Sequence, residues 1–510
     1  MISATTSAHR PWPWLLSLWL LVAGGLSLWM ASSPLPAFAT GMAWLFLAGL
    51  VFTQWFNRAM FGVFFAELVL GGRGRIIEIR NTVPIRLAIG VFLVLAFLLG
   101  WFADGRASNF ELKKSRACIM GAVMGTATFL FFGLFLGHVY GNSPDYIVAE
   151  ARGFLFLAGG LPLLFFAIRR KADVNFVVGC FLAVVAFFGV AKSFGYSLVL
   201  AGIMSPKQLG AMIEQYIPQE LGSGNISRLI PAPRLYMSGD FWMMFTLPLF
   251  VSLALAAKTR RAKVLLYGGI AVLFVGLVAS ETRGLWLAAL LALAVVFWLS
   301  SLGSKVKIAV VLPFMLLGVL ALSQDFLPSV QERMKMSLDF TEDSSNLGRI
   351  SQFAPLMDMA RKHIILGNGF GSYAHDHPGV DVQAPWSYEL QPVSFLMKMG
   401  IVGCAAWGLF VGWLLLDLWR IYKRGGDPTH RVIAKGLLAG MLGLLFASAT
   451  NPSFATSAGM GCLIFTVVMA DMLRQPLPAA KQKENGISQR NRVQGSRMSF
   501  LRGAPVQMHR

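Results

Sequence analysis

The sequence predicts an all-α polytopic membrane protein with about 12–14 transmembrane helices. Of its 510 residues, 56% are hydrophobic and only 13% are charged, a balance that excludes a soluble globular domain of ordinary composition. The apolar residues fall into runs of about 20, the length that a helix needs to cross the hydrocarbon core. These runs are continuous rather than alternating, which excludes a membrane β-barrel and leaves helices, whose backbone groups are satisfied internally.

The predicted spans follow one another from residue 13 to residue 474, and no internal repeat is evident among them. The first run precedes "PAFA" at 36–39, which resembles a signal-peptidase site, but the length of the run favours a transmembrane helix. A short apolar run at 60–70 is left open as a further, broken or re-entrant span. The spans are expected at 13–31, 37–56, 83–103, 118–140, 150–168, 175–196, 240–257, 263–280, 285–303, 307–322, 393–418, 433–450 and 455–474.

One integral membrane domain is therefore expected over residues 1–474, followed by a disordered, basic tail over 475–510, where apolar residues become scarce. Much of the formal net charge of +20 lies in this tail and in short loops. The positive-inside rule gives that distribution to a cytoplasmic face, so no nucleic acid partner is expected. The cysteines show no metal-ligand spacing and are expected to be packing residues. They are Cys118, Cys180, Cys404 and Cys462.

Basic segments set the expected orientation. The segments "RRKAD" at 169, "KTRRAK" at 258, "SKVK" at 304 and "RIYKRGGDPTHR" at 420 are separated by even numbers of spans, as is the tail, so all of them are expected in the cytoplasm. The segments 205–239, 280–284 and 323–392 then face the periplasm. The last of these has nine acidic residues against five basic ones, and this reversed balance supports an outside location.

The outer loop 323–392 is far longer than an ordinary connection, and such loops are commonly functional. Its apolar residues from Ile350 to Ile364 recur every three or four positions, which predicts a short amphipathic helix along the membrane surface. The sequence "GNGFGS" at 367–372 then ends that helix. Its glycines predict a turn or a close backbone approach to a ligand, because no strand precedes them as a dinucleotide fingerprint requires.

Several arginines lie on the predicted outer face, against the positive-inside bias. Arg283 in "ETRGLWLA" begins a span there, and it fits either snorkelling to the interface beside Trp286 or an anion clamp. Further outer arginines are Arg228, Arg234 and Arg349. Cations that converge on one side favour an anionic ligand held at the membrane surface.

The loop also carries acid and histidine side chains. His375 and His377 in "HDHP" flank an aspartate, but a third ligand at suitable spacing is missing, so a site without metal or cofactor is expected. Glu389 stands beside Trp386 and Tyr388 just before a long span. A single loop glutamate is more often solvated, yet partial desolvation at this position is expected to raise its pKa toward the range of a general base.

The motif "ETRGLWLAALLALAVVF", the outer loop with "LGRISQFAPLMDMARKHIILGNGFGSY" and the following helix with "GIVG" resemble the O-antigen ligase and polysaccharide polymerase superfamily, over about residues 230 to 470. The segment "RLYMSGDFWMMFTLPLFVSLAL" at 234–255 also resembles the family's entry to the preceding span. The resemblance implies metal-independent, inverting glycosyl transfer at the outer face of a bacterial inner membrane, from a saccharide on undecaprenyl diphosphate. Cations would then stabilise the leaving group, and a base would deprotonate the attacking hydroxyl.

The resemblance also implies roles for single residues. Arg283 and Arg349 match family arginines and are expected to bind the diphosphate, with Arg234 as a weaker third ligand. The family's ligases usually place a histidine where this chain has Glu389, so Glu389 is expected to be the base. His375 or His377 is the fallback base.

This departure favours a membrane glycosyltransferase that polymerises lipid-linked repeat units into an exopolysaccharide, capsule or O-antigen. The first alternative is ligation of a finished glycan to lipid A core or protein. The second is a transporter of the lipid-linked saccharide, which is disfavoured because the unusual polar residues concentrate in outer loops rather than inside spans; a scaffold role is a third. Expected partners are undecaprenyl-diphosphate-linked oligosaccharide, membrane lipids, and polysaccharide export and chain-length proteins.

Overall fold

The structure is a computed structural model. It describes residues 78–79, 83–84, 116–160, 174–205, 208, 224–227, 234–237, 239–280, 282–306, 309, 344–374, 385 and 387–474. The predicted spans 13–31 and 37–56, nearly all of 83–103 and 307–322, residues 161–168 of the span 150–168, the apolar run at 60–70 and the tail from 475 lie outside the described residues. The total of about 12–14 spans, an estimate from the length of apolar runs, therefore stays a prediction.

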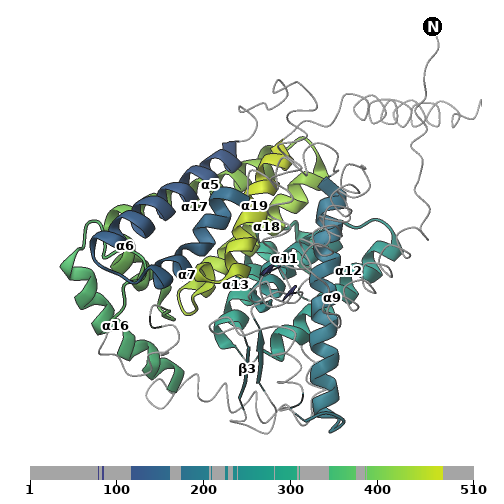
Figure 1. Cartoon of the computed structure of the whole chain (residues 1–510). Helices are drawn as coiled ribbons and strands as arrows, with labels where there is room; N and C mark the ends of the chain where they lie inside the picture. The colour runs from purple at the N-terminus through teal and green to yellow at the C-terminus, as the bar shows by residue number, and fades with distance from the viewer. Residues whose placement is uncertain are drawn as a thin grey trace, which may run out of the picture. The chain divides into compact units, whose positions relative to one another are not determined.

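Helices dominate the described residues (Figure 1). Five of them are long and apolar enough to cross a membrane: Arg116–Val139, Val174–Val199, Arg260–Val278, Gln391–Arg424 and Pro428–Ser448. Two shorter apolar helices, Asp240–Ala256 and Arg283–Trp298, join them. The predicted class, an all-α polytopic membrane protein, is confirmed. Two small antiparallel hairpins accompany the helices: β1 (Glu78–Ile79) with β2 (Val83–Pro84), and β3 (Gly224–Ser227) with β4 (Arg234–Met237).

Most helices begin close to the predicted spans, but the helix that begins at Pro144 starts before the predicted span 150–168. They are α5 (Arg116–Ala127), η3 (Thr128–Phe135), α6 (Leu136–Val139), α7 (Pro144–Leu155), η4 (Phe156–Gly160), α9 (Val174–Leu200), α11 (Asp240–Ala256), α12 (Arg260–Val278), α13 (Arg283–Trp298), α16 (Ser344–Lys362), α17 (Gln391–Arg424), α18 (Pro428–Ser448), η5 (Ser453–Ala455) and α19 (Ser457–Arg474). The elements η3 and η4 are π-helical. Helix α16 occupies the stretch for which an amphipathic loop helix is predicted.

Helix α11 lies at the centre of the bundle and packs against α12, α13 and α18. Its side chains from Phe241 to Phe250 are almost all buried, as expected for a helix that is apolar on every side. Glycines on α18 allow this close packing, because a methyl group at Gly440 would overlap the carbonyl oxygen of Phe245. Small residues commonly occupy such interfaces between membrane helices.

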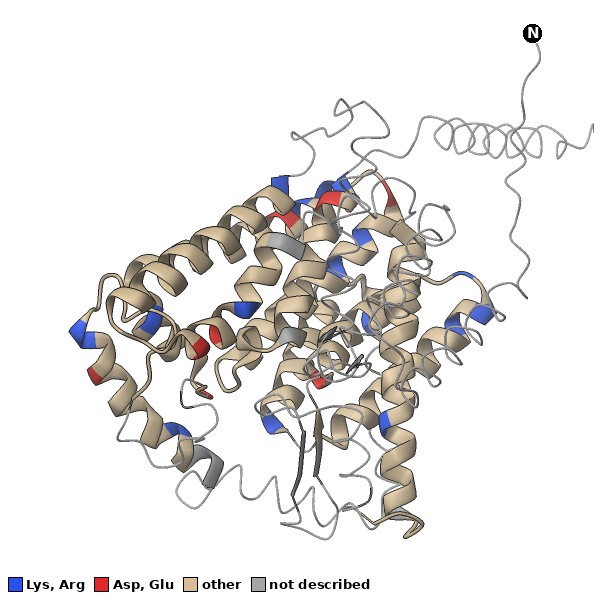
Figure 2. Ribbon diagram, in the orientation of Figure 1, with Lys and Arg blue, Asp and Glu red and all other residues tan. Residues whose placement is uncertain are grey.

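Polar contacts join several helix termini at one end of the bundle, which is the upper end in Figure 2. The Asp471 carboxylate accepts the backbone N–H groups of Ala117 and Cys118, and so caps the start of α5. Tyr422 Oη donates to the carbonyl of Leu299 at 2.6 Å, which joins the end of α17 to the end of α13. The opposite end therefore holds the start of α13, the start of α17 and η5.

Candidate active site

Helix α16 packs against the start of α17 through a small apolar cluster that is separate from the main core. Leu356, Ala360, Tyr388 and Met397 form its buried centre. In the first half of α16 the side chains of Leu347, Ile350 and Phe353, which recur every three residues, are exposed. A helix is thus present where one is predicted, but its predicted apolar residues divide: Leu356 and Ala360 are buried against α17, whereas Ile350 and Phe353 are exposed.

Arg349 and Glu389 form an ion pair where α16 meets α17. Arg349 Nε lies 2.9 Å from Glu389 Oε2, and the two side chains are 21% and 46% exposed. Gln352, one turn after Arg349, accepts the backbone N–H of Glu389 through Oε1 at 3.1 Å. Two residues that were predicted separately, one as a diphosphate ligand and one as a base, therefore lie together. The predicted rise in the pKa of Glu389 stays a prediction.

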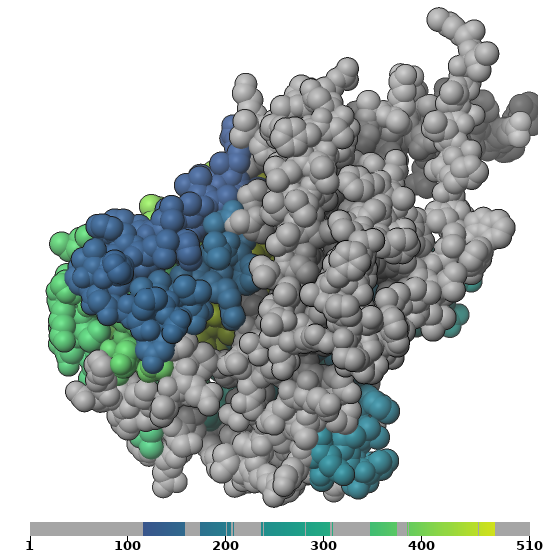
Figure 3. Space-filling view, in the orientation of Figure 1, coloured from purple at the N-terminus to yellow at the C-terminus, as the bar shows by residue number. Residues whose placement is uncertain are grey.

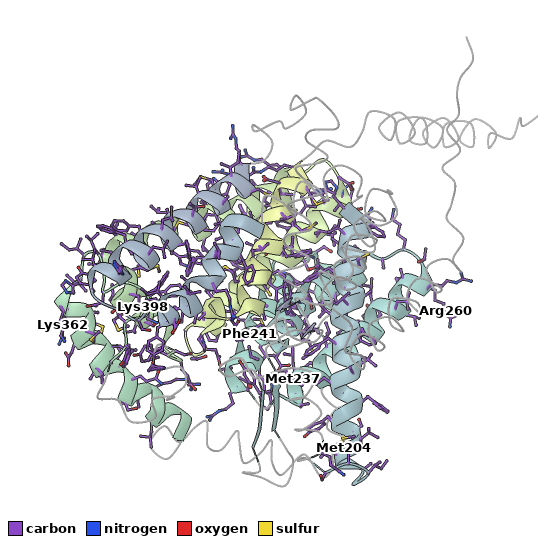
Figure 4. All side chains as sticks on the ribbon, viewed as in Figure 1. Met204, Met237, Phe241, Arg260, Lys362 and Lys398 are labelled. Carbon is purple, nitrogen blue, oxygen red and sulfur yellow. The ribbon has the colours of Figure 1, made fainter. Side chains whose placement is uncertain are left out.

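A second ion pair, formed by Glu150 of α7 and Lys398 of α17, lies inside the protein beside the first. Both residues are buried, and Glu150 Oε2 also accepts the backbone N–H of Gly371 at 2.8 Å. The Lys398 ammonium stands 5.3 Å from the ring centroid of Tyr388, the residue before Glu389. Figure 4 labels Lys398 in this interior position, where α7, α16 and α17 approach one another. We call Glu150, Lys398 and Tyr388 the inner clasp.

Tyr388 bonds a residue on the other side of the segment that contains the predicted histidines. Its hydroxyl accepts the backbone N–H of Ala374 at 2.7 Å, so the residue before His375 is fixed to the residue before Glu389. Burial raises the pKa of Tyr388 to about 12, and the hydrogen bond from Ala374 opposes that rise. His375 and His377 themselves lie outside the described residues.

The backbone of the segment "GNGFGS" contacts the backbone of two other helical segments. Gly367, Gly369 and Gly371 all have positive φ, which favours glycine. The N–H of Gly369 donates to Lys398 O at 3.0 Å, and the N–H of Phe370 donates to Phe132 O in the π-helix η3 at 2.9 Å. The predicted close backbone approach is present, but its partners are other helices of this chain. In Figure 3 the green surface of the α16 region adjoins the blue surface of α5 to α7.

Helix α17 is interrupted at Gly400, which has φ +61° and ψ −170°. The N–H groups of Ile401 and Val402 donate to the carbonyls of Ile364 and Ile365, at 2.9 and 3.1 Å. The chain after α16 therefore satisfies the backbone that the break exposes. This arrangement fixes the N-terminal part of α17, which carries Lys398 and follows Glu389.

Arg283 is the first residue of α13, as the sequence predicts for the start of a span. The next residue, Gly284, faces the turn after α18, because a methyl group there would lie 2.6 Å from Thr450 Oγ1 and 2.8 Å from Asn451 Nδ2. Trp286 donates its indole N–H to the carbonyl of Leu277 at 2.7 Å, so it joins α13 to α12. This contact gives the Trp286 indole a hydrogen-bond partner within the protein. A role as an interfacial anchor is therefore not needed to explain the position of Trp286.

A continuous series of contacts links Arg283 to the Arg349–Glu389 pair. The turn that faces Gly284 leads into η5, where the N–H of Ser453 donates to Asn451 O at 2.7 Å. The N–H of Phe454 then donates to Gln391 Oε1 at 3.1 Å. The N–H of Gln391 in turn donates to the carbonyl of Glu389 at 3.0 Å. The starts of α13 and α17 therefore meet at η5, at the same end of the bundle.

Arg234 opens β4, where it pairs with Ser227 of β3. The hairpin is tied to α11 because Asp240 Oδ2 accepts the N–H of Met237 at 3.0 Å. Asp240 Oδ1 also pairs with Lys192 Nζ of α9 at 2.6 Å, and both side chains are fully buried. Figure 4 labels Met237 and, one residue after Asp240, Phe241. The structure thus anchors the Arg234 strand to the bundle.

Sequence reasoning missed the buried charges. Glu150, Lys192, Asp240 and Lys398 lie inside helices, so the inference that unusual polar residues concentrate in outer loops was wrong. The available signal was a single charge within an otherwise apolar run, as in "FLMKMG" around Lys398, and such a charge marks a functional or structural site. Within the part of the chain that the structure describes, no three His, Cys, Asp or Glu side chains gather as a metal site would require.

Comparison with known proteins supports the resemblance. Residues 268–408 match the family model described as O-antigen ligase. This segment includes Arg283, Arg349 and Glu389 together with Lys398 of the inner clasp. No curated protein matches the sequence. The match supports the O-antigen ligase and polymerase superfamily and indicates an enzyme of the membrane glycosyltransferase type.

Proposed function

We propose that this protein, whose residues 268–408 match the O-antigen ligase family model, polymerises undecaprenyl-diphosphate-linked oligosaccharide repeat units. The product is an exopolysaccharide, capsule or O-antigen, assembled at the periplasmic face of the bacterial inner membrane with the C-terminus in the cytoplasm. The reaction is an inverting glycosyl transfer that uses no metal ion. Polysaccharide export and chain-length proteins are the expected partners.

The observation that carries this proposal is the Arg349–Glu389 ion pair. It joins a carboxylate and a guanidinium at 2.9 Å in a partly exposed position, inside the segment that matches the family. Glycosyl transfer from a lipid diphosphate needs both groups, a base for the attacking hydroxyl and a cation for the departing phosphate. A pair that is neither fully solvated nor fully buried can hold substrate without unfolding the protein around it.

In the proposed step, Glu389 accepts the proton of the acceptor sugar hydroxyl. The hydroxyl oxygen attacks the anomeric carbon of the donor, and the bond from that carbon to the diphosphate oxygen breaks with inversion. The electron pair leaves with undecaprenyl diphosphate. Arg349 presents five N–H donors in a planar fork, so one guanidinium can contact the carboxylate and a phosphate oxygen together.

Arg283 is the second proposed diphosphate ligand. It lies at the first turn of α13, where the backbone N–H groups and the helix dipole also favour an anion. The contacts through η5 support a location for Arg283 at the same end of the bundle as Glu389. Arg234 is a weaker third ligand, carried by the hairpin that Asp240 fastens to α11. His375 or His377 is the proposed fallback base.

Ligation is the alternative within the same chemistry. A ligase transfers a finished glycan once to lipid A core or to protein, whereas a polymerase extends the chain repeatedly. Glu389 at the position of the family's histidine favours polymerisation, because it departs from the pattern of the ligases.

Transport of the lipid-linked saccharide is the alternative from another class, and the structure contains two features that favour it. The buried Glu150–Lys398 and Lys192–Asp240 pairs place charges within helices, and α17 is interrupted at Gly400. Transporters use intramembrane charges and broken helices of this kind. Here each charge has a protein partner, and the carbonyls of the preceding loop accept the N–H groups after the break, so glycosyl transfer remains the proposal.

Purified protein in detergent, incubated with lipid-linked repeat units from the producing cells, separates these functions. Polymerisation gives a ladder of products with increasing repeat number. Ligation gives a single transfer to an added acceptor, and transport leaves the length of the saccharide unchanged. We expect a ladder from the wild type and a rate about 10²–10⁴-fold lower from Glu389→Gln. A wild-type protein that forms no glycosidic bond under any of these conditions contradicts the proposed function.

A further inference from the structure

The junction between η5 and α17 contains two buried polar groups that have no hydrogen-bond partner among the described residues. Gln391 is 3% exposed and Ser453 is fully buried. Gln391 Oε1 accepts the N–H of Phe454 at 3.1 Å, but the Nε2 group of Gln391 and the Oγ of Ser453 make no hydrogen bond to any residue that the structure describes. A buried polar group that makes no hydrogen bond destabilises the folded state by about 1–3 kcal/mol. Each such group in a native protein therefore requires an explanation.

The two groups lie in one place. Phe454, whose N–H bonds Gln391, is the residue after Ser453. Gln391 follows Glu389 by two residues and donates its N–H to the carbonyl of Glu389. On the other side, Ser453 bonds Asn451, which faces the start of α13 beside Arg283. The unbonded amide and hydroxyl groups therefore lie between Glu389, the proposed base, and Arg283, the proposed diphosphate ligand.

The hydrogen-bonding groups of Gln391 and Ser453 favour a neutral ligand. An amide NH₂ donates two hydrogen bonds, and a serine hydroxyl both donates and accepts. Neither group carries a charge that would hold a phosphate, for which the arginines are suited. Sugar hydroxyls match these groups, because each hydroxyl can accept from the amide and exchange a hydrogen bond with serine.

From this position and chemistry we propose that Gln391 and Ser453 form a subsite for the hydroxyls of the acceptor saccharide. This inference rests on the proposed function, because the acceptor is the sugar whose hydroxyl Glu389 deprotonates. Both polar atoms are covered in the structure, so acceptor binding includes a local rearrangement that uncovers them. The subsite positions the acceptor ring, and its loss raises KM for the acceptor more than it lowers kcat.

Two substitutions remove the polar groups while preserving their surroundings. Ser453→Ala deletes only the unpartnered hydroxyl, so the protein should be as stable as the wild type or more so. Gln391→Glu keeps an oxygen to accept the N–H of Phe454 and replaces only the amide donors. A glutamate is also tolerated in the first turn of α17 by the helix dipole.

Ser252 provides a matched control. Its hydroxyl is also fully buried and has no hydrogen-bond partner in the described part of the chain, but it lies near the end of α11 that leads to α12, away from η5. Ser252→Ala therefore makes the same chemical change at the far end of the bundle. A general effect of removing a buried hydroxyl would appear equally in both serine variants.

The test measures kcat and KM for lipid-linked repeat units extracted from the producing cells, and the Kd of the same material for each purified variant. We expect Ser453→Ala and Gln391→Glu to raise KM and Kd about threefold to tenfold, and Ser252→Ala to change neither. Unchanged KM and Kd in Ser453→Ala, with wild-type stability, overturn the subsite. If the wild type binds the repeat units without turnover, the proposed function fails while Kd still decides the subsite. A wild type that does not bind them contradicts both.

Discussion

Two ion pairs at the junction of α16 and α17 differ most in their exposure. Arg349 and Glu389 are 21% and 46% exposed, whereas Lys398 and Glu150 are 1% and 8% exposed. A partly exposed pair contributes at most about 1 kcal/mol to stability. Breaking a buried pair by removing one partner costs about 3–5 kcal/mol, because the remaining charge stays uncompensated. We infer that the inner pair holds the junction and that the outer pair is available for chemistry.

The difference teaches how a membrane protein can place reactive charges at its surface. The inner clasp also holds backbone groups, because Glu150 accepts the N–H of Gly371 and Tyr388, which precedes Glu389 in the chain, accepts the N–H of Ala374. The outer pair is held by one additional contact, from Gln352 to the Glu389 backbone. If the proposed function holds, stability and reactivity are carried by neighbouring groups that substitution can separate.

The largest effect is expected at the break in α17 that supports the inner clasp. Gly400→Ala would force a side chain into a left-handed backbone and into the carbonyl oxygen of Ile365. We expect a loss of folded protein, seen as aggregation in size-exclusion chromatography after detergent extraction. Gly408→Ala, in the same helix with open space around it, is the matched control and should fold normally. Equal yields of both variants contradict the importance of the break.

Removal of the Lys398 charge tests the inner clasp directly. Lys398→Met leaves Glu150 buried and unpaired, so the free energy of unfolding should fall by about 3–5 kcal/mol. The double variant Lys398→Met with Glu150→Gln should recover most of this loss. Chemical unfolding in detergent micelles measures both, and Lys423→Met at the opposite end of α17 is the control. A double variant that is as unstable as Lys398→Met argues against a specific pair.

Breaking the outer pair, Arg349 and Glu389, should lower activity rather than stability. Arg349→Ala should lower turnover of lipid-linked repeat units about 10²-fold, the cost of losing one group that stabilises a developing charge. Its free energy of unfolding should change by about 1 kcal/mol or less. Arg361→Ala removes an arginine from the same helix, one that pairs with Asp358 in solvent, and should change neither quantity. Similar turnover in both variants removes Arg349 from the proposed site.

Tyr388 gives the smallest expected effect and a pH signature. Burial raises the pKa of Tyr388 to about 12, so its hydroxyl proton dissociates at a lower pH in the unfolded chain than in the native state. The free energy of unfolding therefore falls as pH rises from about 10 to 12. Tyr388→Phe should abolish that loss and cost about 1 kcal/mol at neutral pH, since Ala374 N–H loses its acceptor. Ultraviolet titration of tyrosinate should show one late-titrating group fewer in the variant. An unchanged titration curve contradicts the burial of this hydroxyl.

Much of the fold could be predicted because hydrophobic runs of sufficient length have few alternatives in lipid. The starts of α13 and α17 fall within two residues of the predicted spans at 285 and 393. The spacing of apolar residues from Ile350 to Ile364 predicts a helix, and the structure has one over Ser344–Lys362. These features depend on local pattern, which the sequence displays directly.

The contacts between distant segments could not be predicted in the same way. Nothing local to Glu150 or Lys398 indicates that they pair across 248 positions of the chain. The π-helix that exposes Phe132 O to the N–H of Phe370 likewise has no signature in its sequence, "TFLFFGLF". Arg349 and Glu389 were each predicted as site residues, but their pairing follows from how α16 packs on α17, which a single sequence does not specify.

The central claim, that the chemistry depends on the outer pair, is tested most directly by polysaccharide length in cells that carry Glu389→Gln. The variant preserves size and removes only the proton acceptor, so membrane abundance should match the wild type. We expect polymer to be absent or reduced to single repeat units at equal protein abundance. Full-length polymer in that strain would contradict the assignment of Glu389 as the base.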